Sequence, residues 1–159
     1  MKEISLGTYR MTVDLRRTQD WYQKETIEWC NCAGCRNMAQ VFRSLPPAVE
    51  SFFATFGVDL MCPAETAYYA GKSLASGSSD VLSSAFYHIC GELLEGSRAS
   101  VIKHFEDDYG DQWHIQDGWF AMFKKECDLL ADGFPRPCFQ MEVFCTIPWV
   151  LDEPNPYLH

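Results

Sequence analysis

The sequence lacks long apolar runs. None of its hydrophobic stretches approaches the roughly 20 consecutive apolar residues that a membrane-spanning helix needs. The amino-terminal segment, MKEISLGTYRM, contains neither the apolar block of a secretory signal nor a small-residue cleavage site. These two absences argue against a membrane protein and predict a cytosolic one.

Positive charge is also scarce. The chain has 13 lysine and arginine residues against 22 aspartate and glutamate residues, a formal net charge of −9. Such a chain repels phosphate backbones, and the small basic group of Arg16, Arg17 and Lys24 is too weak to reverse this. We therefore expect no nucleic-acid or membrane partner, and a basic protein or a second copy of the chain is the favoured macromolecular partner.

Familiar catalytic motifs are absent too. The sequence contains no G-x-S-x-G, no phosphate-binding glycine loop and no H-E-x-x-H. The acidic run at 106–111 does not have the spacing of an EF-hand loop, and solvated charge is its favoured interpretation. No reaction class is indicated and no catalytic residue is assigned, so the balance is against an enzyme.

The composition that remains is that of one folded domain. The 159 residues are 47% hydrophobic and 14% aromatic, which is typical of a chain that buries a sizeable core. No linker or internal repeat divides residues 1–159. A proline-rich tail from about residue 148, with Pro148, Pro154 and Pro156, is expected to be irregular.

Apolar spacing predicts a helix pair over about residues 34–57. The first stripe consists of Met38, Val41, Phe42 and Leu45, and the second of Val49, Phe52, Phe53 and Phe56. Both repeat at three and four residues, the spacing of one helix face. Pro46 and Pro47 end the first helix and start the second, and Gly57 is suited to the final cap. We expect the two helices to share a continuous apolar seam.

Strand patterns fill most of the remaining chain. The first 29 residues are expected to be strands, because Met11, Val13 and Leu15 alternate with polar residues before a turn and a short strand at 26–29. Further strands are predicted at 65–72, 85–94, 113–115, 119–124 and 138–147. Helices that are grouped, rather than alternating with strands, predict an α+β fold with a mostly antiparallel sheet covered by the 34–57 helix pair.

The sharpest local feature is the segment W-C-x-C-x-x-C-R-N at 29–37. Cys30 and Cys32 would lie on one side of an extended chain, and Cys35 would lie in the first turn of the following helix. Three thiolates that converge in this way can hold zinc if a fourth ligand completes the site. Cys62, which follows the helix pair, and His88 are the two candidates for that fourth position.

Two other interpretations of the same cysteines stay open. A complete zinc site usually shows a second C-x-x-C pair, and its absence favours thiols that simply pack or face solvent. Alternatively, Cys32 and Cys35 have the spacing of a redox pair, and a helix N-terminus with Arg36 beside it would lower a thiol pKa. Redox motifs of that kind follow a βαβ pattern, which this sequence does not show.

Aromatic residues supply the other candidate site. Trp113, Trp119, Tyr68 and Tyr69 lie on or near strands whose faces alternate poorly. An exposed patch of such residues would mark a binding groove or a dimer surface, although a sheet covered on both sides explains them equally well. The favoured hypothesis is therefore a non-catalytic binding domain, an inhibitor or immunity-like protein with an acidic, aromatic surface. A zinc-stabilised or thiol-redox protein is the alternative, and an enzyme with a cleft beside the helix pair stays possible.

The cysteine segment and the later string I-P-W-V-L at 147–151 resemble a group of small bacterial proteins without an assigned function. The strings L-P-P at 45–47 and F-G-V-D at 56–59 add to the likeness. The resemblance implies one bacterial cytosolic domain, and it implies no catalytic residues.

Overall fold

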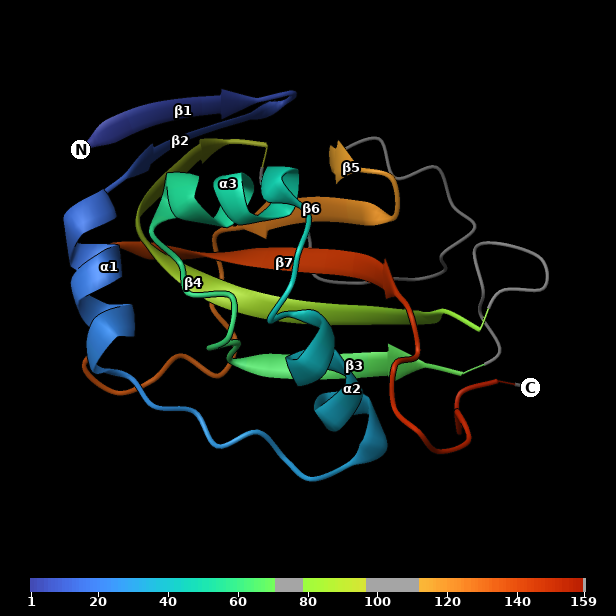
Figure 1. The fold of residues 1–159 in the computed structure, drawn as a ribbon. Coiled ribbons are helices and arrows are strands. Elements are labelled where there is room, and N and C mark those ends of the chain that lie inside the picture. Colours follow the sequence, from blue (N-terminus) through green and yellow to red (C-terminus); the bar gives the residue numbers. More distant parts are fainter. Residues whose placement is uncertain (71–78, 97–111, 159) are drawn as a thin grey trace.

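The computed structural model describes residues 1–70, 79–96 and 112–158 (Figure 1). These residues form a seven-stranded antiparallel sheet with three helices, so the predicted α+β class is confirmed. The strands are β1 (Lys2–Leu6), β2 (Tyr9–Val13), β3 (Glu65–Tyr69), β4 (Val81–Glu95), β5 (Trp113–Gln116), β6 (Trp119–Lys124) and β7 (Cys138–Ile147). The helices are α1 (Leu15–Lys24), α2 (Ala33–Val41) and α3 (Pro47–Phe56).

The long strand β4 organises the sheet. The strand order of the sheet is β1-β2-β4-β7-β6-β5, and β3 is also paired to β4. Since β7 occupies one side of β4, β2 and β3 share the other side: β3 pairs with Leu82–Phe86, and β2 pairs with the segment from Gly91 to Glu95. Gly91 permits the second pairing, because a Cβ at this position would lie 1.9 Å from the carbonyl oxygen of Thr12. Strand β3 therefore pairs on one side only among the described residues.

The apolar face of α3 packs on this sheet. Phe53 contacts Tyr87 of β4 edge to face, and Phe56 contacts Phe123 of β6, with ring centroids 5.1 and 5.5 Å apart. Helix α3 starts at Pro47 and is capped by Gly57 in the left-handed conformation, as the sequence predicted. The helix pair is therefore present at 34–57. The apolar residues of both helices belong to one buried core together with residues of the sheet, and Phe42, which follows α2, contacts Trp119 of β6.

The strands predicted after residue 60 agree closely with β3 to β7. Strands β6 and β7 have the predicted limits, and β3 has the predicted start. The strand predicted at 85–94 lies within β4. Residues 71–72 and the acidic run at 106–111 lie outside the described residues. Residues 148–158 contain no helix or strand.

The prediction for residues 15–29 was wrong. Residues 15–24 form helix α1, and residues 26–29 have no regular structure. The helix begins because Asp14 caps it, its Oδ1 accepting a hydrogen bond from the Arg17 amide at 3.1 Å. Thr18 and Tyr22, four residues apart, form its buried side. The alternation of Met11 and Val13 continues for one more apolar residue, Leu15. It therefore suggested that the strand goes on, although the chain enters a helix after Asp14.

Helix α1 is fixed to β4 by hydrogen bonds from these two buried side chains. The Thr18 hydroxyl accepts a hydrogen bond from the Cys90 amide at 3.1 Å. The Tyr22 hydroxyl donates to the His88 carbonyl oxygen at 2.9 Å and accepts from the His88 amide at 3.1 Å. None of the helices in the described part of the chain is long and apolar enough to cross a membrane.

Candidate metal centre

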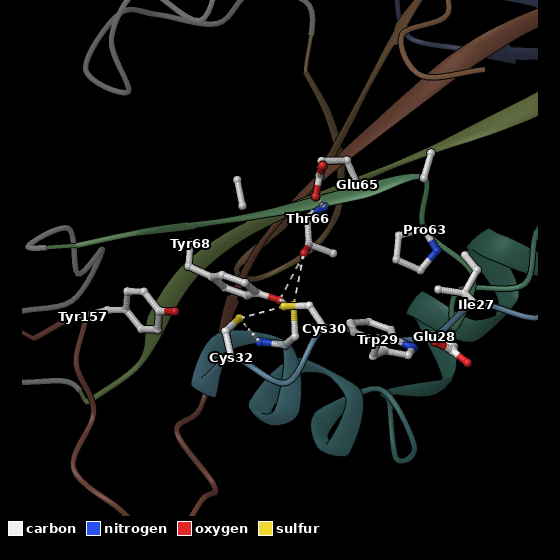
Figure 2. Close-up of a pocket in the computed structure, with 13 residues that line it drawn as sticks. Ile27, Glu28, Trp29, Cys30, Cys32, Pro63, Glu65, Thr66, Tyr68 and Tyr157 are labelled. Carbon is white, nitrogen blue, oxygen red and sulfur yellow. Dashed lines mark hydrogen bonds between the residues drawn. The ribbon is translucent and has the colours of Figure 1, made fainter. Parts of the chain in front are cut away.

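The sulfur atoms of Cys30, Cys32 and Cys35 converge at the start of α2 (Figure 2). The Cys30 sulfur lies 3.2 Å from that of Cys32 and 3.1 Å from that of Cys35. All three sulfurs lie within 4.8 Å of one another. All eight cysteines of the chain are free thiols in the structure, so these contacts are between unbonded sulfurs.

The start of α2 explains why the three sulfurs meet. Cys32 is the N-cap residue of the helix and has an extended backbone, and its sulfur accepts a hydrogen bond from the Cys35 amide at 3.4 Å. Cys35 follows in the first turn, which places its side chain beside the capping sulfur. The predicted arrangement of an extended segment that enters a helix is therefore present. The sequence did not indicate that the Cys30 sulfur would lie between the other two.

The edge strand β3 supplies hydroxyl groups to the deepest cysteine. Cys35 is buried, and its sulfur accepts a hydrogen bond from the Tyr68 hydroxyl at 3.3 Å. The Thr66 hydroxyl oxygen lies 3.6 Å from the same sulfur. Burial raises the pKa of the Cys35 thiol to about 11. Hydrogen bonds to Cys35 and to the Cys32 backbone lower the pKa of exposed Cys30, so Cys30 ionises more readily than an ordinary thiol and Cys35 less readily.

The three cysteines open into a pocket of about 510 Å³ between the 27–35 segment, β3 and the carboxyl-terminal tail. Figure 2 shows Tyr68 reaching toward the sulfurs from β3, with Trp29 and Pro63 at the opposite end. Apolar lining residues are Ile27, Trp29, Pro63, Ala64, Ala67 and parts of Tyr68 and Tyr157. Two carboxylates, Glu28 and Glu65, also line the pocket. The site is therefore a half-open, acidic pocket with the sulfurs in its wall.

The tail after β7 is fastened to α2 immediately beside the cysteines. The Asn37 side chain is buried, donating to the Pro148 carbonyl oxygen at 2.9 Å and accepting from the Val150 amide at 2.8 Å. The Arg36 guanidinium forms two hydrogen bonds with the Glu153 carboxylate, at 2.7 and 3.1 Å. These contacts join residues 36–37 to the tail at 148–153, which lies more than 100 residues later in the sequence.

The tail then contributes Tyr157 to the pocket wall. Its ring packs against Tyr68, with centroids 5.5 Å apart. Gly34 makes this close approach possible, because an added Cβ would lie 2.5 Å from the Tyr68 ring and 2.6 Å from the Tyr157 hydroxyl oxygen. The second residue of α2 must therefore lack a side chain if both tyrosines are to lie over the cysteines.

Neither candidate for a fourth ligand joins the three sulfurs among the described residues. The segment around Cys62 lies close to the cysteine segment, since Trp29 donates a hydrogen bond to the Met61 carbonyl oxygen. The Cys62 thiol, however, donates to the Asp59 carboxylate at 3.8 Å. His88 is a buried sheet residue whose Nε2 bonds to the Asp128 carbonyl oxygen at 2.9 Å. Burial lowers the pKa of His88, in keeping with a satisfied core histidine.

The four aromatic candidates do not form one surface. Trp119 is only 4% exposed and belongs to the core, in contact with Phe42. Trp113 is half-buried on β5 at one end of the strand order, whereas Tyr68 and Tyr69 lie on β3, paired to β4. Every aromatic side chain in the described ranges is buried or half-buried. Of the four, Tyr68 is the one that reaches the candidate site.

Sequence reasoning missed four contributors to the site: Gly34, Thr66, Asn37 and Tyr157. Gly34 and Asn37 lie inside the cysteine segment, so their position next to the sulfurs was an available signal. Thr66 and Tyr157 carried none, because nothing in a single sequence shows that β3 and the tail meet at α2. No family model matches the chain, and the comparisons with curated proteins and with solved structures found no similar protein.

Proposed function

We propose that the chain binds a thiophilic metal ion through Cys30, Cys32 and Cys35, with zinc as the first ion to test. The observation that supports this is the convergence of three sulfurs from one short segment, two of the pairs being 3.1 and 3.2 Å apart. Tetrahedral zinc with bonds of about 2.3 Å separates its sulfur ligands by about 3.8 Å. Small rotations of the exposed Cys30 and Cys32 side chains would open the cluster to that spacing.

The surroundings of Cys35 support the same function. Metal ligands commonly receive hydrogen bonds that orient them, and the Tyr68 hydroxyl plays this part for the Cys35 sulfur. The fourth position of a tetrahedral ion would face the pocket, where water or a small ligand has access. Sites with three protein ligands and one open position are those that allow chemistry at the metal.

The experiment is a zinc titration of reduced, metal-free protein, with competition against a chromophoric chelator. We expect one zinc per chain and a loss of three reactive thiols. C30S should weaken binding by more than the roughly 10- to 100-fold typical of losing an outer hydrogen-bond partner. C62S is the matched control, because Cys62 is a neighbouring thiol outside the cluster. Binding below one ion per chain, or equal affinity in C30S and C62S, would reject the proposal.

The interaction role predicted from composition now has one support, the net charge of −9. That charge still favours a basic partner. The aromatic part of the prediction gains no support, since the described aromatic residues are buried or half-buried. The metal site is therefore the better supported of the two functions.

A further inference from the structure

The spacing of the three sulfurs bears on which ion they suit. With ligands about 2.3 Å from a central ion, tetrahedral angles separate neighbouring sulfurs by about 3.8 Å, whereas right angles separate them by about 3.3 Å. The Cys30 sulfur lies 3.2 and 3.1 Å from its two neighbours, and the third pair lies within 4.8 Å. The two short distances are close to those of a pyramidal centre with three ligands, whose bond angles approach a right angle.

The ligand set is consistent with three-coordination. In the part of the chain that the structure describes, no further histidine, cysteine or carboxylate joins the group. The hydroxyls of Thr66 and Tyr68 lie beside the cluster, and both already contact the Cys35 sulfur. The open side of the cluster faces pocket walls that include the apolar side chains of Ile27 and Trp29. A fourth direction occupied by a lone pair, rather than by a ligand, fits these surroundings.

Charge favours the same kind of centre. Three thiolates around a divalent ion carry a net charge of −1, whereas three thiolates around a trivalent ion are neutral. Glu28 and Glu65 line the same pocket, and the chain carries a net charge of −9. An added negative charge in an acidic pocket is opposed by Coulomb repulsion, and a neutral centre is not.

We propose that the preferred ligand of this site is a trivalent, three-coordinate thiophile of the arsenite and antimonite class. The inference rests on the proposed function, since it concerns the same three sulfurs. Arsenous acid, As(OH)₃, exchanges its three hydroxyl groups for the three cysteine sulfurs. Three As–O bonds break, three As–S bonds form, and each thiol proton leaves with a hydroxyl group as water. Arsenic stays trivalent, so the step needs neither oxidant nor reductant.

The test uses arsenite and zinc on reduced, metal-free C127S protein. This background removes a competing pair, because the Cys127 and Cys138 sulfurs lie 3.8 Å apart and would form a two-thiol site. Native mass spectrometry should show one arsenic per chain with the loss of three protons. The reactive thiol count should fall by three. Arsenite should also displace zinc from the same protein when the two are present at equal concentration.

Serine variants identify the site. In this background C30S and C32S replace exposed cysteines, so both should fold, and each should lower arsenite affinity by more than roughly 10- to 100-fold. C62S should bind as the parent does. Uptake of arsenic through only two thiols, or affinity retained in C30S, would overturn the inference. Stoichiometric zinc that arsenite fails to displace would overturn it while leaving the proposed function intact. If neither ion binds, both proposals fail.

Discussion

Replacing Gly34 with alanine tests whether the packing of α2 against two tyrosines shapes the site. The new Cβ would lie 2.5 Å from the Tyr68 ring and 2.6 Å from the Tyr157 hydroxyl oxygen, so one or both side chains must move. Tyr157 belongs to the tail, and its ring packs against Tyr68 and Trp149. The Tyr68 hydroxyl oxygen lies 3.3 Å from both the Cys35 sulfur and the Thr66 hydroxyl oxygen, so moving this side chain disrupts hydrogen bonding at the site.

Two effects of opposite sign set the size of the change in stability. Overpacking of this kind costs about 1–3 kcal/mol. Alanine in place of glycine inside a helix returns up to about 1 kcal/mol. With the full alanine gain counted, we therefore expect Gly34→Ala to lower the free energy of unfolding by up to about 2 kcal/mol, measured by urea denaturation followed by tryptophan fluorescence. Gln40→Ala is the matched control, because Gln40 is an exposed residue of the same helix and reports helix propensity alone.

A second measurement links this change to the site. Displacement of Tyr68 removes a hydrogen bond from the Cys35 sulfur and uncovers it, so alkylation of Cys35, followed by mass spectrometry of peptides, should become faster. The same rate should be unchanged in the Gln40→Ala control. A Gly34→Ala protein that is at least as stable as its parent, with Cys35 alkylated at the parental rate, would refute the proposed packing.

Three further predictions concern the contacts that hold the site in place. Tyr22→Phe should cost about 1–3 kcal/mol in urea denaturation, because it leaves the backbone polar groups of His88 without their partner; no loss would mean that α1 is not anchored there. Burial lowers the pKa of His88, so below about pH 6.5 the unfolded chain binds a proton at this residue more readily than the folded chain does, and the free energy of unfolding should fall. His88→Gln should flatten this pH dependence in a series of denaturation curves. An unchanged slope would contradict the prediction. Asn37→Ala should expose the tail to limited proteolysis and lower the free energy of unfolding by about 1–3 kcal/mol, because it removes buried hydrogen bonds. Glu153→Gln breaks an exposed ion pair with Arg36 and should lower the free energy of unfolding by less than about 1 kcal/mol. Equal effects of the two variants would contradict the prediction that the buried contact matters more.

Much of the sheet could be predicted because its strands carry local patterns. Strand β7 alternates apolar and polar residues along its length, and β6 is separated from β5 by a turn at Asp117 and Gly118. Helix α3 was predictable for a similar reason, since its proline start, apolar stripe and glycine cap are all local signals. Helix α1 was missed because its buried side comprises only Thr18 and Tyr22, two residues with hydroxyl groups whose hydrogen-bond partners lie on β4.

The candidate site also has a part that local sequence determined and a part that depends on tertiary packing. The sequence by itself determined that Cys30, Cys32 and Cys35 share a segment that enters a helix, because a cap and a first turn are made by neighbouring residues. Only the tertiary structure decided that the Cys30 sulfur lies between the other two, that Cys62 lies outside the cluster, and that Tyr68 bonds to the Cys35 sulfur.

The pocket itself depends on contacts between residues that are distant in the sequence. Asn37 binds a tail that begins 111 residues later, and Tyr157 packs against Tyr68. Such pairings follow from how the sheet orders its strands and where the chain leaves it, which no local spacing records. The local sequence therefore determined that three thiols lie close together at the start of a helix. The packing of β3, α2 and the tail decided how these thiols are buried, hydrogen-bonded and exposed to a ligand.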